Sequence, residues 1–156
     1  MELWELVARE SIRDLVARYN ACGDAGRFDD LLALFADDAF LEVVGSETAR
    51  GREQIRSLMT RAARVDPRSP AAAGRPRVLR HFTATHQIDV EGPDAASGRC
   101  YFAVLTADGL DHWGRYVDRY VRGPARWLFQ SRRVTVDAAI AGGWGARASE
   151  RAPGDS

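Results

Sequence analysis

Three side chains of this sequence could together move a proton on an organic molecule: the phenol of Tyr19, the carboxylate of Asp24 and the imidazole of His81. A carboxylate that bonds one imidazole nitrogen fixes the tautomer and makes the other nitrogen more basic. That nitrogen can take a proton beside a carbonyl group. The phenol can bond the oxygen that gains charge, or protonate a departing hydroxide. This chemistry requires no cofactor, and we expect none.

Each of the three residues also fits a structural role. Asp24 stands between two glycines, where aspartate commonly forms a turn with its own backbone. A single histidine such as His81 is often a core residue, and Tyr19 falls on the apolar face of a predicted helix. The sequence has no phosphate-binding glycine loop, no metal-spaced cysteine pair and no serine elbow. The catalytic interpretation therefore depends on whether the fold brings Asp24 and His81 together.

Further candidates lie on the predicted strands. His86 is five residues beyond His81, so a regular strand would turn it to the opposite face, and we rank it lower. The strand predicted at residues 112–122 places three alternate residues on one face: His112, Gly114 and Tyr116. One carboxylate and one nearby imidazole fall short of the three protein ligands that a catalytic zinc site uses, so we expect no metal.

Composition describes an ordinary soluble domain. The 156 residues are 46% hydrophobic and 28% charged, with 22 Lys+Arg against 22 Asp+Glu. This balance provides no field that would attract nucleic acid or an anionic membrane. The first ten residues carry glutamates where a signal peptide would carry basic residues, and no apolar run approaches the ~20 residues of a membrane span. We expect a cytoplasmic protein, with Cys22 and Cys100 reduced and buried.

The first half of the chain has the periodicity of helices. Apolar residues with helical spacing predict one helix over residues 3–22, which two glycines end. A second helix is expected at residues 28–35 and a short strand at residues 40–44. A third helix opens at Gly51.

The second half has the pattern of strands. A stretch rich in proline, alanine and arginine at residues 66–76 is expected to be a flexible flap. Hairpin-sized turns then separate four strands, which form an antiparallel meander at residues 78–90, 98–106, 112–122 and 127–137. We expect one domain over residues 1–137 and a disordered tail at residues 138–156.

Helices followed by long antiparallel strands indicate an α+β domain with the helices on one face of a sheet. Long strands twist and, with bulges, curl. Three helices laid into a strongly curved sheet leave a cone-shaped, apolar cavity that suits a small hydrophobic organic substrate. The other face of such a sheet needs a cover, so we expect a homodimer.

The order and spacing of four segments resemble the SnoaL-like branch of the nuclear transport factor 2-like superfamily, over about residues 8–137. The segments are ESIRDLVARYNACGDAGRFDDLLALFADDAFLEV, GREQI, RHFTATHQIDVEGPDA and GRYVDRYVRGPARWLFQSRR. The resemblance implies a cone of three helices on a curved antiparallel sheet. The superfamily includes scytalone dehydratase, a bile-acid dehydratase, a dehydrochlorinase, polyketide cyclases, ketosteroid isomerases and proteins without known catalysis.

The resemblance also implies roles for particular residues. Asp24 matches the aspartate that follows the first helix of the elimination enzymes, and His81 matches their histidine at the start of the second strand. Tyr19 precedes Asp24 by the spacing of the bile-acid enzyme, and Gly114 and Tyr116 match positions that line the scytalone dehydratase pocket. The second histidine of scytalone dehydratase has no counterpart on the following strand.

The sequence therefore predicts a cofactor-independent lyase, a dehydratase-type enzyme acting on a small cyclic or polyketide-like carbonyl compound. The catalytic residues would be Tyr19, Asp24 and His81. A polyketide cyclase or a ketosteroid-type isomerase using the same pair is an alternative, because enolate formation begins all these reactions. A non-catalytic small-molecule binding module is another.

Overall fold

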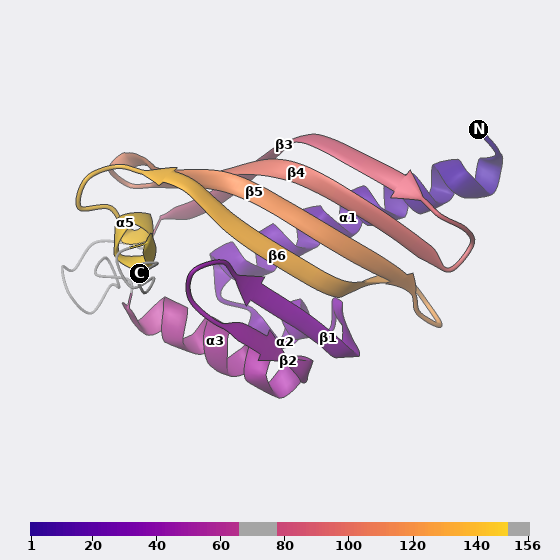
Figure 1. The fold of residues 1–156 in the computed structure, drawn as a ribbon, viewed down its shortest axis with the longest axis horizontal. Helices are drawn as coiled ribbons and strands as arrows, with labels where there is room; N and C mark the ends of the chain where they lie inside the picture. Colours follow the sequence, from indigo (N-terminus) through magenta and orange to yellow (C-terminus); the bar gives the residue numbers. More distant parts are fainter. Residues whose placement is uncertain (66–77, 150–156) are drawn as a thin grey trace, which may run out of the picture.

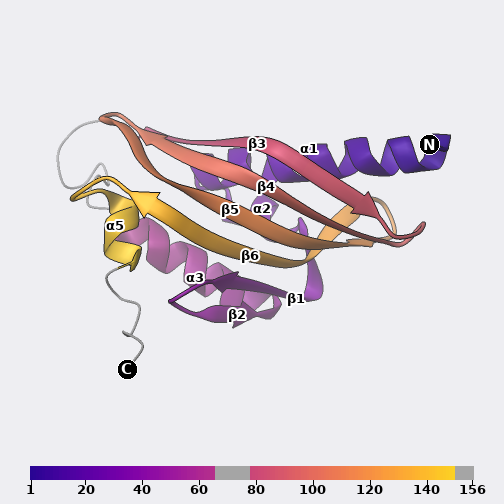
Figure 2. The same cartoon turned by 45° about the horizontal axis from the view of Figure 1, so that its top comes forward.

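The chain folds as expected into an α+β domain, with its helices on one face of a curved, six-stranded sheet (Figure 1; Figure 2). The computed structural model describes residues 1–65 and 78–149. The predicted flap at residues 66–76 lies outside these described residues.

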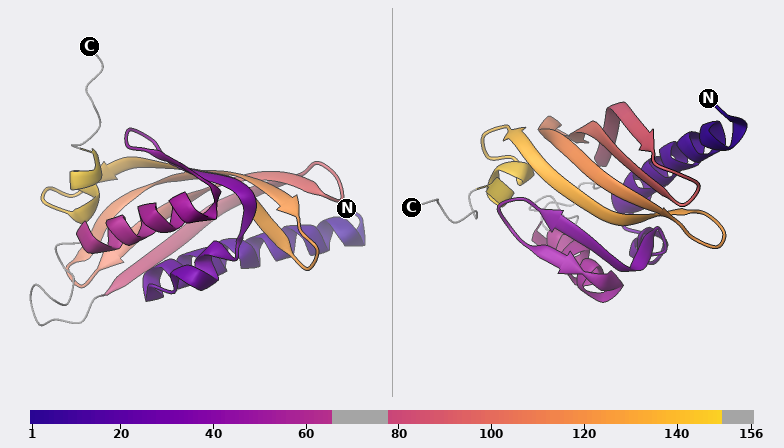
Figure 3. Two further views of the ribbon diagram at one scale, coloured as in Figure 1. Left: turned by 90° about the horizontal axis from the view of Figure 1, so that it is seen from below. Right: turned by 45° about the vertical axis from the view of Figure 1, so that its right-hand side comes forward.

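Three helices precede the meander, as predicted, but the second is shorter than expected. They are α1 (Leu3–Ala25), α2 (Phe28–Leu32) and α3 (Gly51–Val65). The prediction that the second helix reaches Phe35 is wrong, because Phe35 begins the first strand and is fully buried opposite Phe129. Pairing with a distant strand thus overrides local helical spacing. Viewed from below, α1 and α3 lie along the same face of the sheet (Figure 3).

The sheet has the strand order β2-β1-β6-β5-β4-β3. The strands are β1 (Phe35–Val43), β2 (Thr48–Arg50), β3 (Leu79–Val90), β4 (Ala95–Thr106), β5 (Gly109–Arg122) and β6 (Trp127–Ala139). The last four form the predicted antiparallel meander, whereas β1 runs parallel to β6. No hairpin joins β1 to β6, so no turn forces those two strands to run in opposite directions.

A bulge interrupts β3 near its middle. Ala84 pairs with Tyr101 and Gln87 with Arg99, so β3 advances three residues while β4 advances two. Thr85 takes a left-handed backbone conformation, with φ 54°. One extra residue shifts the in–out alternation of a strand by one position. Odd-numbered residues before this bulge and even-numbered residues after it therefore point to the same face of the sheet.

The core contains a fully buried ion pair. Arg132 donates from Nε to Asp118 Oδ1 at 2.9 Å and from Nη2 to Oδ2 at 2.7 Å, and both side chains have zero exposure. The guanidinium carbon lies 4.2 Å from the ring centre of Tyr19, 4.0 Å from that of Tyr116 and 4.4 Å from that of Phe129. Aromatic faces attract a cation, so the charge is held between its carboxylate and three rings.

The expectation of a disordered tail from residue 138 is wrong for residues 138–149. β6 continues to Ala139, and a short helix, α5 (Trp144–Ser149), follows. Asp111 on β5 holds its start: Oδ2 accepts the N–H of Trp144 and Oδ1 accepts that of Gly145, each at 2.9 Å. Composition alone indicated disorder because the carboxylate that satisfies these N–H groups comes from another element.

Candidate active site

Asp24 and His81 meet where the end of α1 approaches the start of β3, although they are 57 residues apart. The carboxylate binds His81 twice. Its Oδ2 accepts the backbone N–H at 3.0 Å, and its Oδ1 lies 2.6 Å from Nδ1. The side chains are 12% and 17% exposed, respectively. Since a carboxylate only accepts, Nδ1 carries the proton and Nε2 is the basic nitrogen.

The end of α1 explains why Asp24 is available. Gly26 takes a left-handed conformation, with φ 69°, and its N–H bonds the carbonyls of Cys22 and Gly23. This closes the helix immediately after Asp24. The carboxylate is therefore not required as a turn former, and it is directed across to β3 instead.

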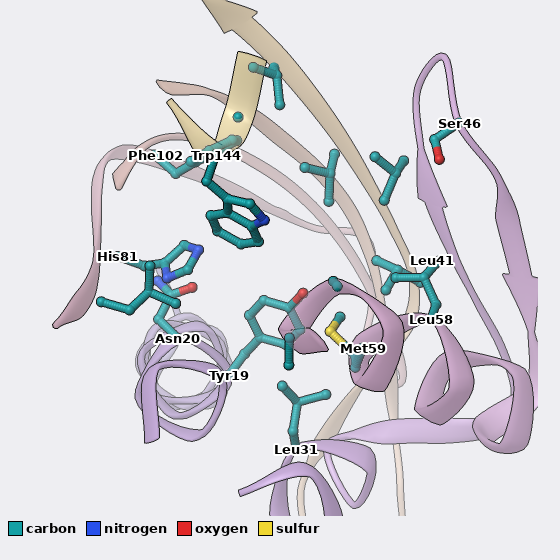
Figure 4. Close-up of a pocket in the computed structure, with 18 of the residues that line it drawn as sticks. Tyr19, Asn20, Leu31, Leu41, Ser46, Leu58, Met59, His81, Phe102 and Trp144 are labelled. Carbon is teal, nitrogen blue, oxygen red and sulfur yellow. The ribbon is translucent and has the colours of Figure 1, made fainter. Parts of the chain in front are cut away.

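A cavity of about 930 Å³ lies between the helices and the sheet, with His81 in its wall. Figure 4 shows Tyr19, Asn20 and His81 on one side, Leu41 and Leu58 on the other, and Trp144 above them. Most of the remaining wall is apolar and includes Phe28, Leu31, Val43, Met59, Leu79, Val134 and Val136. Such a cavity suits an organic molecule with its polar groups at one end.

Tyr19 lines the cavity and is 8% exposed. Burial raises its pKa, while the positive charge of Arg132 opposes that rise. The phenol is therefore protonated at neutral pH and can donate a hydrogen bond. Arg132 under its ring makes the hydroxyl a better donor than burial alone would allow.

His112 reaches the same cavity from β5. It pairs in register with Val104, which in turn pairs with His81, so the two histidines are two strands apart, about 10 Å between Cα atoms. His112 Nδ1 lies 2.7 Å from Asp111 Oδ1. The carboxylate that starts α5 therefore also orients this imidazole, and Trp144 packs edge-on against it, with ring centres 5.3 Å apart.

Of the other predicted pocket residues, Tyr116 lines the cavity and Gly114 does not. Burial raises the pKa of Tyr116 well above its usual value. Its ring stacks on Phe102, with centres 4.5 Å apart. A Cβ at Gly114 would come within 1.9 Å of the carbonyl oxygen of Thr135, so this position serves close strand packing.

The expectation that His86 faces away from His81 is wrong, because the bulge at Thr85 reverses the alternation. His86 lies on the inner face, with Nε2 3.3 Å from the hydroxyl of Tyr120. That hydroxyl donates to Asp118 at 2.9 Å. His86 does not line the cavity, so it belongs to the network around the buried ion pair rather than to the pair with Asp24.

His86 provides a pH dependence of stability. Burial lowers its pKa, with Asp118 raising it and Arg132 and Arg13 lowering it in turn. The unfolded chain therefore binds a proton more readily than the folded protein. The folded protein is therefore most stable, as far as His86 is concerned, above the unfolded pKa of about 6.5, and this stability is lost as the pH falls from there through the lower folded pKa.

We expect the free energy of unfolding of His86→Gln to fall less steeply than that of the wild type between pH 8 and pH 5. Urea unfolding at several pH values measures it, with Gln87→Ala, an exposed neighbour, as the control that keeps the wild-type slope. A His86→Gln slope equal to that of the wild type contradicts this assignment.

Three features of the site were not singled out from the sequence. Arg132 is not among the residues predicted for the site, although its guanidinium lies over the ring of Tyr19. Trp144 lay in the supposed tail, yet it forms part of the cavity wall. Asn20 stands next to Tyr19 in α1, and only its place on the face that carries Asp24 four residues later could have identified it.

No helix in residues 1–65 and 78–149 has the length and apolarity to cross a membrane.

The comparisons with known proteins agree with this architecture. A profile of the SnoaL-like domain matches residues 4–133. An NTF2-like protein with a cystatin-like fold from Novosphingobium aromaticivorans is 30% identical, with a TM-score of 0.69; the match covers 92% of this chain and 89% of that one. No curated protein sequence matches.

Two further solved structures are similar. Rv3472 of Mycobacterium tuberculosis, a protein of unknown function, is 26% identical, with a TM-score of 0.72 and coverage of 88% of this chain and 76% of that one. LinA is 19% identical, with a TM-score of 0.74 and coverage of 90% and 94%, which shows a shared fold. With its profile match over most of its length, this chain belongs to the SnoaL-like domain family.

Proposed function

We propose that the protein is a cofactor-independent lyase that performs a dehydratase-type elimination on a small cyclic or polyketide-like carbonyl compound. The observation that carries this proposal is the bond between Asp24 and His81 Nδ1, which leaves Nε2 as the base in the wall of an apolar cavity. The resemblance to the elimination enzymes of the superfamily implies the same two roles for Asp24 and His81. Tyr19 supplies a nearby proton donor.

In the proposed reaction, Nε2 of His81 removes a proton from the carbon beside the carbonyl. The C–H electrons form the enolate, whose oxygen accepts a hydrogen bond from Tyr19. The enolate then re-forms the carbonyl and a carbon–carbon double bond, while the C–O bond to the β-hydroxyl breaks. The departing hydroxide takes the proton held by His81, or takes that of Tyr19, which the proton on His81 then replaces, and water leaves. Asp24 stabilises the imidazolium during the first step.

Cyclisation and double-bond isomerisation begin with the same enolate. They differ in the bond that the enolate electrons form next. In a cyclase the enolate carbon bonds to a second carbonyl carbon, and in an isomerase a different carbon of the conjugated enolate takes up a proton. Both reactions are compatible with one base and one phenol in an apolar cavity, and they stay as alternatives within this proposal.

Deuterium exchange tests the shared first step. We expect the protein to accelerate exchange of the acidic protons of 1-tetralone in D2O, followed by proton NMR, because abstraction by His81 precedes any later step. Conversion of 4-hydroxy-4-phenylbutan-2-one to its enone, followed by ultraviolet absorbance, tests elimination. Exchange without elimination favours a cyclase or isomerase. Binding of both ketones with no exchange overturns the enzyme and leaves the binding module.

We also propose that the protein forms a homodimer. The face of the sheet opposite the helices exposes aromatic and aliphatic side chains among its arginines, and a second copy could cover them. The exposed apolar residues on it include Phe82, Tyr101, Trp113 and Val117.

A further inference from the structure

The amide oxygen of Asn20 has no hydrogen-bond partner among the described residues, although Asn20 lies in the cavity wall. Asn20 is 6% exposed, and its Oδ1 is buried. Figure 4 shows it beside His81 and Tyr19, on the wall formed by α1 and β3. A buried amide oxygen that makes no hydrogen bond destabilises the folded state. Stability alone would favour a residue such as leucine at this position.

The helix places this amide close to the proposed base. Asn20 and Asp24 are four residues apart, so they lie on the same face of α1, one turn from each other. Asp24 holds His81, and His81 therefore stands above the turn that carries Asn20. A ligand atom bonded to the amide would lie only a few bonds from the carbon from which His81 removes a proton.

The amide of Asn20 can bind either a hydrogen-bond donor or a hydrogen-bond acceptor of a ligand. Rotation about the last torsion of asparagine is broad and roughly two-fold, so either its oxygen or its nitrogen can be turned to the cavity. The oxygen accepts from a hydroxyl group, and the nitrogen donates to a carbonyl. The wall opposite is apolar, with Leu41 and Leu58 facing Asn20 across the cavity (Figure 4). A ligand therefore gains polar contacts at the α1 end.

We propose that Asn20 recognises a second oxygen of the substrate, a hydroxyl or carbonyl group near the carbon that loses its proton. The substrate class is then an oxygenated ketone, with its carbonyl oxygen on Tyr19 and its second oxygen on Asn20. The inference rests on the proposed function and makes it narrower. A site that bonds a hydroxyl rejects the analogue that lacks it, because the buried polar group then stays unpaired.

Binding of two matched ketones tests this role without turnover. The probes are 1-tetralone and 2-hydroxy-1-tetralone, which has no β-hydroxyl to eliminate, and tryptophan fluorescence gives each Kd. We expect the wild type to bind the hydroxy ketone about tenfold more tightly, the equivalent of ~1.4 kcal/mol. Asn20→Leu should bind both ketones equally and unfold at a higher temperature. Met59→Leu, an apolar change in the same cavity, should keep the tenfold preference.

The outcomes separate the two proposals. If Asn20→Leu keeps the preference for the hydroxy ketone, or if the wild type has none, the role of Asn20 is overturned while deuterium exchange still tests His81. If Asn20→Leu loses the preference but the wild type exchanges no deuterium, the amide recognises a ligand that the protein does not convert. If the wild type binds neither ketone, both the role of Asn20 and the proposed substrate class fail.

Discussion

His81→Ala is expected to lower the rate of deuterium exchange into 1-tetralone by roughly 10²–10⁴-fold, the contribution typical of a general base. The reason is that Nε2 is the basic nitrogen that the pair with Asp24 leaves to the cavity. Asp24→Asn should lower the rate more than it weakens ketone binding. An amide in place of the carboxylate can donate to Nδ1 and so reverse the tautomer.

The controls come from the same strand. His86→Gln removes the other inner-face histidine of β3, which bonds Tyr120 and does not line the cavity, so its exchange rate should stay within a few-fold of the wild type. Circular dichroism spectra of all three variants should match that of the wild type. Exchange by a folded His81→Ala protein at nearly the wild-type rate would rule out His81 as the base.

The buried ion pair should produce the largest change in stability. Asp118→Ala leaves the guanidinium of Arg132 in the core without its counter-charge, and we expect a loss of about 3–5 kcal/mol in the free energy of unfolding. In the wild type, burial lowers the pKa of Arg132, but the charge and hydrogen bonds of Asp118, together with Tyr19 and Tyr116, outweigh burial and raise it. Without Asp118 the guanidinium still keeps its proton, because arginine is not deprotonated in proteins, so the variant cannot relieve the buried charge in that way. Urea unfolding measures the loss.

A double variant and a surface pair distinguish the mechanism. Asp118→Leu combined with Arg132→Met removes both charges and should recover much of the stability that Asp118→Ala loses. Arg119→Ala breaks an ion pair with Glu91 in which both side chains are well exposed, and it should change the unfolding free energy by only about 0–1 kcal/mol. A loss from Asp118→Ala no greater than that from Arg119→Ala would contradict the burial argument.

Much of the fold could be predicted from the sequence, because most helices and strands follow from the local periodicity of apolar residues. The apolar stripe of α1 and the alternation in β4 and β5 result directly from burying one face of each element. Phe35 is the counterexample. Its helical spacing is real, but β6 offers it a partner in Phe129 that no local window contains. The same limit hid α5, whose first N–H groups are satisfied by Asp111, more than thirty residues earlier in the chain.

Site residues could be predicted from the sequence where they matched a family pattern, but not where their role depends on contacts between distant elements. Asp24 and His81 could be paired before any geometry was known, although their catalytic role stays a proposal. Arg132 could not be placed, because an arginine in a strand is normally solvated and only the neighbouring Asp118 justifies its burial. Asn20 could not be identified from the sequence either, because what distinguishes it is a buried amide oxygen that accepts no hydrogen bond from the described residues.

The extra residue at Thr85 divides β3 into two segments whose inward-facing positions have opposite parity. Before it, odd-numbered positions such as Leu79 and His81 face inward and serve the cavity; after it, even-numbered positions such as His86 and Ile88 close the core. A strand without the insertion could keep only one of these sets inside. Comparison of relatives across this strand therefore needs a gap of one residue wherever the insertion is lacking, and an ungapped alignment would equate inward residues with outward ones.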